Sequence, residues 1–176
     1  MPDQKTARFP WGLTIAAFLA FALLMSLGTW QVQRLQWKQG LISRAEAAAD
    51  LPPVPIMQVY RPSEEFRKVV VDCPGLATAP FVELRTIEDG QPGVRLISPC
   101  RLPNRPFVAL VDRGFVAETI SARPPVRPSQ DPVQIIAELR NPPDRPAMAL
   151  PAEDRRFFWR DQRGMARALG IQKWAA

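Results

Sequence analysis

The 176-residue chain contains no histidine, and this absence limits the chemistry open to it. Histidine is the usual general base near neutral pH, a common zinc ligand and the usual proximal haem ligand. A Ser-His-Asp or Cys-His nucleophile system is therefore excluded within this chain. The sequence also lacks a Gly-rich phosphate loop and a paired-carboxylate signature. We therefore predict a non-enzymatic role, with chemistry by Asp and Glu alone as the alternative that stays open.

Cysteine is scarce as well, with only Cys73 and Cys100 present. The two are far apart and form no CxxC spacing, so neither a metal site nor a thioredoxin-like motif is indicated. In an oxidising compartment they can pair as a disulfide. The alternative is two small core residues on neighbouring strands. The sequence leaves both interpretations open.

Charge is absent from the twenty residues between Trp11 and Trp30. Twenty helical residues span roughly 30 Å, the thickness of the hydrocarbon core of a bilayer. The few polar side chains inside, Thr14, Ser26 and Thr29, can bond back to the helix backbone. The two tryptophans lie where the aromatic belts of a membrane protein lie. The pattern predicts a retained transmembrane helix.

A cleavable signal peptide and a buried globular helix are the two alternatives to this anchor. Lys5 and Arg8 resemble the basic start of a signal peptide, but the small residues between 45 and 49 lie too far beyond the apolar segment to form its cleavage site. A buried globular helix of this length without charge is unusual. Basic residues flank the segment on both sides, so the positive-inside rule gives no clear orientation. The short leading tail favours an amino terminus in the cytoplasm.

Proline is abundant, at 20 residues, and the formal net charge is +6. Proline clusters begin at Pro52, Pro124 and Pro142, where they interrupt helices and mark connections. The basic residues are scattered and show no nucleic-acid motif, so we predict a surface of mixed charge near a membrane and no nucleic-acid partner. We predict four regions: a cytoplasmic tail (1–10), a transmembrane helix (11–30), a juxtamembrane helix (31–51) and a β-rich extramembrane domain (52–176).

The juxtamembrane helix is expected to present one face rich in aromatic and small residues. Spacings of 4, 3, 4, 4 and 3 place on that face Trp30, Arg34, Trp37, Leu41, Ala45 and Ala48. Arg34 then lies between two indoles, where it can stack or reach toward head groups. This face either packs on the chain's own domain or forms a membrane-proximal partner contact; the residues of the predicted contact are Trp30, Gln31, Arg34, Trp37 and Lys38.

The sequence after the juxtamembrane helix predicts an α+β fold with an antiparallel sheet or a barrel-like arrangement. Alternating or apolar runs predict five strands at Arg67–Cys73, Phe81–Ile87, Val94–Cys100, Pro106–Val116 and Val133–Leu139. Turns are expected at Pro74-Gly75 and at Glu88-Asp89-Gly90. Near the end we predict a short edge strand at Arg156–Arg160 and a short helix over Gln162–Leu169, with Asp161 as its N-cap and Gly170 just after its end.

One strand carries a second candidate contact at Arg113, Gly114 and Phe115. A glycine inside a strand is typical of a bulge or of a close backbone approach, and Phe115 then belongs to the core. The alternative is a tip that contacts a partner. The structural interpretation is favoured, because glycines inside strands usually have such packing causes.

Three stretches, taken in order, resemble the Surfeit locus protein 1 family of cytochrome c oxidase assembly factors. Leu27 to Lys38 reads LGTWQVQRLQWK and is similar to the family's Leu-Gly-x-Trp-Gln-x-x-Arg-x-x-Trp-Lys at the end of its first membrane helix. Ala109 to Val116 reads ALVDRGFV and is similar to the family's Leu-Val-Asn/Asp-Arg-Gly-Trp-Val-Pro strand. Phe158 to Asp161, followed by Met165-Ala166 and Leu169-Gly170, forms the third. The resemblance covers nearly the whole chain.

The chain departs from the family pattern at several points. Phe115 replaces the usual Trp, and Ala117 replaces the Pro. Family members end in a second membrane helix with a His-containing segment near its start, and this sequence reaches Ala176 without either. The expectation is a fragment or a chain that has lost the helix. The family's proposed haem-binding His has no counterpart here, and no haem ligand is carried over.

The resemblance implies a membrane-anchored assembly factor that helps to place haem a into the catalytic subunit of cytochrome c oxidase. The implied partners are the membrane, that subunit and other assembly factors, and the implied cofactor is haem a, held transiently. No Arg-rich presequence precedes Trp11, so the bacterial inner membrane with a periplasmic domain is expected. The competing hypothesis is a membrane-anchored periplasmic scaffold without a haem role.

Overall fold

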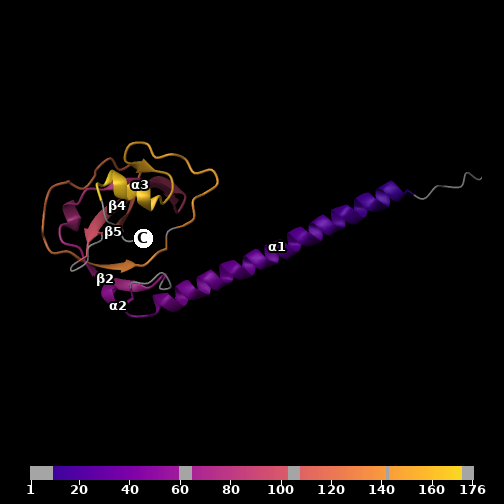
Figure 1. The fold of residues 1–176 in the computed structure, drawn as a ribbon, viewed down its shortest axis with the longest axis horizontal. Helices are drawn as coiled ribbons and strands as arrows, with labels where there is room; N and C mark the ends of the chain where they lie inside the picture. Colours follow the sequence, from indigo (N-terminus) through magenta and orange to yellow (C-terminus); the bar gives the residue numbers. More distant parts are fainter. Residues whose placement is uncertain (1–9, 60–64, 103–107, 142, 172–176) are drawn as a thin grey trace, which may run out of the picture. The chain divides into compact units, whose positions relative to one another are not determined.

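The computed structural model describes residues 10–59, 65–102, 108–141 and 143–171. In chain order its elements are α1 (Trp11–Ala49), β1 (Val54–Pro55), α2 (Ile56–Val59), β2 (Lys68–Asp72), the 3-10 turn η1 (Leu76–Thr78), β3 (Val82–Glu88), β4 (Gln91–Arg101), β5 (Val108–Ala117), β6 (Gln134–Glu138), β7 (Arg156–Phe157) and α3 (Gln162–Ala168). The chain divides into two compact units, Met1–Ala47 and Ala48–Ala176. The first unit holds most of α1, and the described strands lie in the second (Figure 1).

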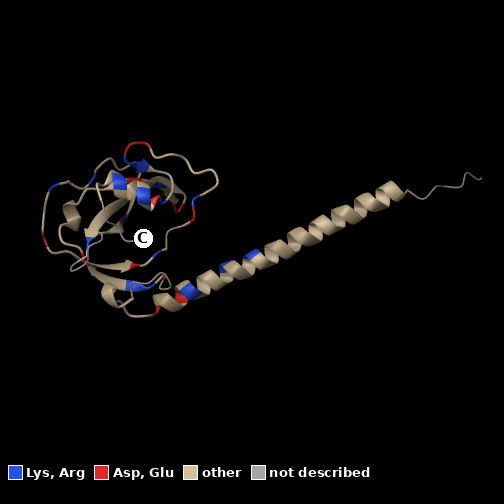
Figure 2. Cartoon of the chain, in the orientation of Figure 1, with Lys and Arg blue, Asp and Glu red and all other residues tan. Residues whose placement is uncertain are grey.

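Helix α1 is one continuous helix of 39 residues, about 58 Å long at 1.5 Å per residue. The hydroxyls of Thr14 and Thr29 donate to the carbonyls four residues earlier, at 3.4 and 2.9 Å, so these polar groups are satisfied within the helix. Its N-terminal part carries no charged residue, and charges begin only in its C-terminal part (Figure 2). Among the described residues, α1 is the helix long and apolar enough to cross a membrane. Its division into a spanning part and a juxtamembrane part stays a prediction.

The described part of the second unit contains two sheets. One has the strand order β1-β2-β6 and the other β5-β4-β3-β7. The long pairings β2–β6, β3–β4 and β4–β5 are antiparallel, as predicted. The two-residue strands β1 and β7 instead pair in parallel with β2 and β3. The described residues form mixed sheets and no closed barrel, so the barrel-like alternative is not realised.

The five predicted strands are confirmed as β2 to β6, with shifted ends. The first residues of the predicted strand Pro106–Val116 lie outside the described residues. The predicted edge strand Arg156–Arg160 is only two residues long as β7, although it does lie at the edge of its sheet. Local patterns gave no indication of β1, α2 or η1, because two to four residues carry too little periodicity to be recognised.

The hairpin between β3 and β4 turns through two residues, Asp89 and Gly90. Their φ angles are 49° and 79°, which is the pair of positive values that a type I′ turn requires. Asp and Gly tolerate this region better than most residues do. The predicted turn at this Asp-Gly pair is therefore confirmed, and it sets the register in which Glu88 lies opposite Gln91.

The residues described for the second unit form two hydrophobic clusters. The first joins β2 to the end of β4, and its buried members are Ile56, Val69, Val71, Cys73, Leu76, Cys100 and Leu102. The second joins β3, β4 and β7 to α3, and its buried members are Val82, Leu84, Ile97, Phe157 and Met165. Alternate residues of β5 contribute to both, since Ala109 and Val111 pack on the first cluster and Leu110 on the second.

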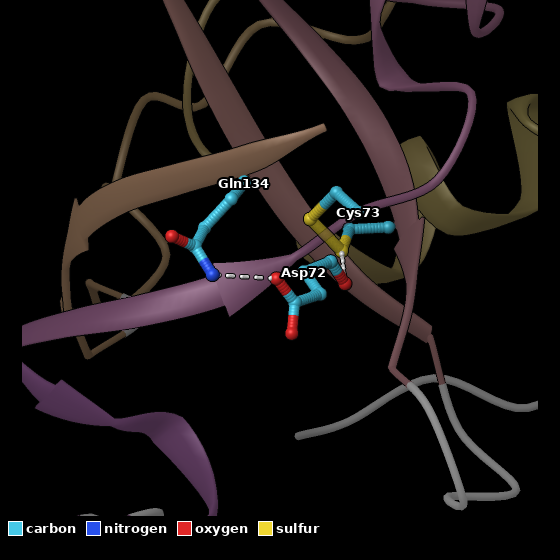
Figure 3. Close-up of a disulfide and its surroundings, with 4 residues drawn as sticks. Asp72, Cys73 and Gln134 are labelled. Carbon is cyan, nitrogen blue, oxygen red and sulfur yellow. Dashed lines mark hydrogen bonds between the residues drawn. A yellow bond between two sulfur atoms is a disulfide. The ribbon is translucent and has the colours of Figure 1, made fainter. Parts of the chain in front are cut away.

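A disulfide between Cys73 and Cys100 connects the two sheets (Figure 3). Cys73 follows β2 directly, and Cys100 lies on β4. Both are buried within the first hydrophobic cluster. Beside them the side-chain amide of Gln134 donates to Asp72 Oδ1 at 2.9 Å. Of the two interpretations that the sequence left open, the structure has the disulfide.

Helix α3 begins and ends where its capping residues predict. The Asp161 side chain accepts from the backbone N–H of Gly164 at 2.9 Å, as an N-cap does. At the other end Gly170 has φ 70° and its N–H donates to the Arg167 carbonyl, while the N–H of Ile171 donates to Ala166. This pair of hydrogen bonds is a Schellman motif. The short helix is thereby held with Met165 buried against β3 and β4.

Candidate functional site

The first candidate contact lies on α1, after its uncharged part. The Arg34 guanidinium carbon lies 5.4 Å from the centroid of the Trp30 ring, within the range of a cation–π interaction. The Trp30 and Trp37 side chains are 51% and 60% exposed, and Gln31 and Lys38 are exposed as well. The structure therefore brings the Arg34 guanidinium to the exposed Trp30 indole, and the exposed Trp37 lies three positions further along the same helix. Their contact with a partner stays a prediction.

The second candidate contact lies on a β-bulge in β5. Arg95 pairs with Phe115 and Ile97 with Asp112, so the single residue between Arg95 and Ile97 faces two residues of β5, Arg113 and Gly114. Gly114 has φ 112°, a backbone region that favours glycine, and its N–H donates to Asp112 Oδ1 at 3.0 Å. The predicted bulge is confirmed. It bends the strand and holds the Asp112 carboxylate in place.

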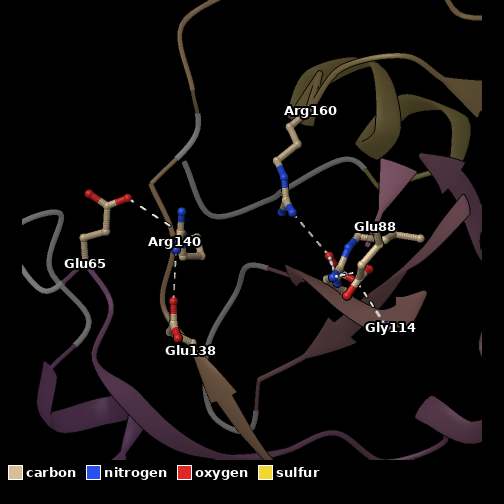
Figure 4. A network of polar contacts seen from close by, with 8 residues as sticks. Glu65, Glu88, Gly114, Glu138, Arg140 and Arg160 are labelled. Atoms are coloured by element: carbon tan, nitrogen blue, oxygen red, sulfur yellow. Dashed lines mark hydrogen bonds and ion pairs between the residues drawn. The ribbon is translucent and has the colours of Figure 1, made fainter. Parts of the chain in front are cut away.

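Asp112 is the centre of an ionic network that joins several elements. Glu88, Gly114 and Arg160 of this network are labelled in Figure 4. Asp112 Oδ2 accepts from Arg95 Nη1 at 3.2 Å and from Arg160 Nη2 at 3.4 Å. Arg95 Nη2 in turn donates to Glu88 Oε2 at 2.7 Å. The network therefore fastens β5 to β4, to the end of β3 and to the segment that leads into α3. It brings together the second and third sequence motifs, whose residues 112 and 160 are 48 positions apart.

Arg113 makes hydrogen bonds to neutral acceptors in the described part of the chain. Its Nη2 donates to the Ala77 carbonyl at 2.9 Å and its Nη1 to the Ser98 hydroxyl at 3.5 Å. Partial burial removes water from the guanidinium and lowers the pKa of Arg113 from its ordinary value. The contacts fasten β5 to the 3-10 turn η1. They support a structural role for Arg113, and a partner contact there stays a prediction.

The half-buried Phe115 packs against a glycine on the neighbouring strand. A Cβ atom added to Gly93 would lie 2.5 Å from two ring atoms of Phe115 and 2.5 Å from the Val116 carbonyl oxygen. The ring therefore occupies the space that a side chain at position 93 would need. This cross-strand contact stabilises the β4–β5 pairing next to the bulge.

The model of the SURF1 family matches residues 18–176, which include the helix motif, the bulge and the Asp112 network. The chain belongs to the SURF1 family. The resemblance inferred from the three sequence motifs is thereby confirmed.

Relatives of the chain share its sequence at modest identity. It is 28% identical to the cytochrome oxidase assembly protein SHY1 of Saccharomyces cerevisiae over 86% of the chain and 42% of that protein. It is 28% identical to Surfeit locus protein 1 of Xenopus tropicalis, covering 84% of the chain and 55% of the relative, and 29% identical to that of Homo sapiens, covering 89% and 61%. The chain thus spans about half the length of these relatives. No solved structure matches it significantly.

Among the described residues of this SURF1-family chain, no His and no free Cys thiolate is available to hold a haem iron. Haem iron is held by His, a Cys thiolate, Met or Tyr. The sequence has no histidine, and both cysteines are joined in the disulfide. Met165 is buried in the second hydrophobic cluster, while Met148 is 92% exposed in a loop. Within the described ranges, no group of three His, Cys, Asp or Glu residues is placed to hold a metal.

Sequence reasoning missed the Asp112 network, although it singled out the residues next to it. Asp112 and Arg160 both belong to family motifs and carry opposite charges. This was the one feature of the sequence that pointed to a contact between them. Arg95 lies in a predicted strand and Glu88 in a predicted turn, and neither position distinguishes them from ordinary surface charges. Only the register of β3, β4 and β5 brings their side chains together.

Proposed function

We propose that this SURF1-family chain is a membrane-anchored assembly factor for a haem-copper cytochrome oxidase. The observation that carries the proposal is the match of the family over residues 18–176, together with a relative named for cytochrome oxidase assembly. The candidate membrane span at α1 supports this proposal, because cytochrome oxidase is itself a membrane enzyme. The role is one of binding and positioning, since the sequence offers no histidine for acid–base catalysis.

The finer proposal is that the chain assists delivery or insertion of haem a into the catalytic subunit. The chain has no His and no free Cys thiolate to serve as an axial haem ligand. We therefore propose that it assists by contacting the catalytic subunit, and not by ligating the haem iron through such residues. The exposed Trp30, Arg34 and Trp37 on α1 are the proposed contact residues, because two indoles and a guanidinium suit an interface.

Deletion of the gene tests this proposal. We expect membranes of the deletion strain to have less haem a by difference absorbance and less oxidase activity, while the catalytic subunit stays detectable by immunoblot. The full chain supplied on a plasmid should restore both. Normal haem a and normal activity in the deletion strain contradict the proposal. Stable co-purification with other envelope proteins and unchanged haem a would instead support the scaffold hypothesis.

We further propose that the chain lies in a bacterial inner membrane with its β-rich unit in the periplasm. The disulfide supports this side, because disulfides persist in oxidising compartments and are rare in the cytosol. Alkylation of thiols in acid-quenched cells should find Cys73 and Cys100 protected in normal cells. They should become reactive in cells that lack the periplasmic disulfide-forming enzyme. Free thiols in normal cells contradict the proposed orientation.

A further inference from the structure

A small polar cavity lies on one face of the sheet that contains β3, β4 and β7. Its volume is about 150 Å³, several times the share of one water molecule. Glu83 and Arg85 alternate along β3 with the buried Val82 and Leu84, so their side chains project from the opposite face. Arg156 of β7 also lines the cavity.

The segment that follows β5 covers this face and completes the cavity, to which it contributes Glu118, Ser121 and Arg123. Arg123 Nε donates to Glu83 Oε1 at 2.7 Å, and Arg85 Nη2 donates to Glu118 Oε1 at 3.1 Å. Two ion pairs therefore fasten the segment to the strand. The cavity is lined from residues far apart in sequence, on elements that hold one another in position.

Glu83 and Glu118 play different parts in the cavity. Both carboxylate oxygens of Glu83 are engaged, Oε1 by Arg123 and Oε2 by Arg156 at 3.4 Å, and its side chain is only 17% exposed. Glu118 is 57% exposed and holds Arg85 by a single contact. An exposed pair of this kind contributes at most about 1 kcal/mol. A competing anion can therefore displace Glu118 more easily than Glu83.

Hydrogen-bond donors are in excess around this cavity. The three guanidiniums carry about fifteen N–H donors. The described residues provide five hydrogen bonds for them: one from Arg85, three from Arg123 and one from Arg156. The Ser121 hydroxyl adds a further donor at the lining. A ligand that satisfies these donors must carry several hydrogen-bond acceptors.

We propose that this cavity binds a doubly charged oxyanion, either a phosphate group or a dicarboxylate. Three arginines and two glutamates give the lining a formal charge of +1. When the ligand displaces Glu118 from Arg85, the remaining charge facing it is +2, which a dianion balances. Planar guanidiniums suit bidentate recognition of both phosphate and carboxylate. This inference goes beyond the role in oxidase assembly and does not depend on it.

Binding of inorganic phosphate and of malonate to the full chain in detergent tests the proposal. Calorimetric titrations are made at matched ionic strength with sodium chloride as the reference, because salt screens exposed charges. Saturable binding of phosphate alone supports a phosphate-bearing ligand, and binding of malonate alone supports a dicarboxylate. Binding of both supports the shared site. Binding of neither overturns the proposal.

Two variants locate the binding at the cavity. Arg85→Gln should weaken binding about tenfold, the effect of losing one charge-assisted hydrogen bond. Arg163→Gln, an exposed arginine on α3, removes the same charge elsewhere and should leave binding unchanged. An equal loss of affinity in both variants overturns the assignment of the binding site to this cavity.

Glu118→Gln moves the affinity in the opposite direction, since it removes the competitor for Arg85. We expect binding to tighten about threefold, the equivalent of one exposed ion pair. This test holds even if Arg85→Gln does not fold, and a variant that merely damaged the structure would weaken binding. Unchanged or weaker binding in Glu118→Gln overturns the proposal.

Discussion

The Cys73–Cys100 disulfide closes a loop across 27 sequence positions and connects the two sheets of the second unit. Because the cross-link restricts the unfolded chain, its entropic contribution follows from the length of the loop. For 27 positions the chain-entropy relation gives about 3.5 kcal/mol at 25 °C. We therefore expect the oxidised chain to be more stable than the reduced chain by about this amount.

The replacement Cys73→Ala with Cys100→Ala removes the cross-link without adding a hydroxyl to a buried position. For a unit of this size a loss of about 3.5 kcal/mol lowers the unfolding midpoint by roughly 10–15 °C. Thermal unfolding followed by circular dichroism measures the shift. Wild-type protein treated with a reductant should show a similar decrease, since it retains both side chains and lacks only the bond.

The reductant should leave the midpoint of the double-alanine variant unchanged, which makes that variant the control. Two results would refute the reasoning. One is a double variant that unfolds within about 2 °C of the oxidised wild type, a difference of less than 1 kcal/mol. The other is a reductant effect that persists in the double variant, because its cause would then lie outside this bond.

Four further substitutions test the contacts described above, three of them in the candidate site and one, Glu118→Ala, at an exposed ion pair for comparison. Asp112→Ala removes the acceptor of two guanidiniums and one backbone N–H, so we expect a loss of about 2–3 kcal/mol in thermal unfolding. Glu118→Ala, which breaks one exposed pair, should cost less than about 1 kcal/mol, and equal losses would contradict the network. Gly93→Ala should cost about 1–3 kcal/mol because its Cβ meets the Phe115 ring and the Val116 carbonyl oxygen, and an unchanged midpoint would contradict this close approach. Arg34→Gln should leave the midpoint unchanged while it lowers oxidase activity in complemented cells; full activity would speak against the contact on α1.

Local chemistry was enough to predict several elements of this protein. The uncharged run after Trp11 predicts a long helix, since nothing in it interrupts helical hydrogen bonding. The Asp89-Gly90 pair predicts the β3–β4 turn, because few residues accept two successive positive φ angles. Asp161 and Gly170 predict both ends of α3. The glycine inside β5 predicts the bulge. Each of these predictions depends on residues adjacent in the chain.

The candidate site could be predicted only in part. The motif around Arg113 indicated the strand and its bulge, and the helix motif indicated the exposed Trp30 and Trp37. Neither motif indicated that Asp112 pairs with Arg160 across 48 positions. Alternation along a strand shows which side chains share a face, but it does not show which strand lies beside it. Opposite charges in two motifs therefore did not by themselves predict a contact.

The sequence alone predicts an apolar helix, a set of strands, their turns and the caps of the last helix. These depend on backbone conformations and hydrogen bonds formed within a few residues. The packed fold was needed to show that Cys73 pairs with Cys100, that β1 and β7 pair in parallel, and that three arginines line one cavity. Those contacts join residues tens of positions apart, and their free energy depends on how the sheets pack, which no local pattern specifies.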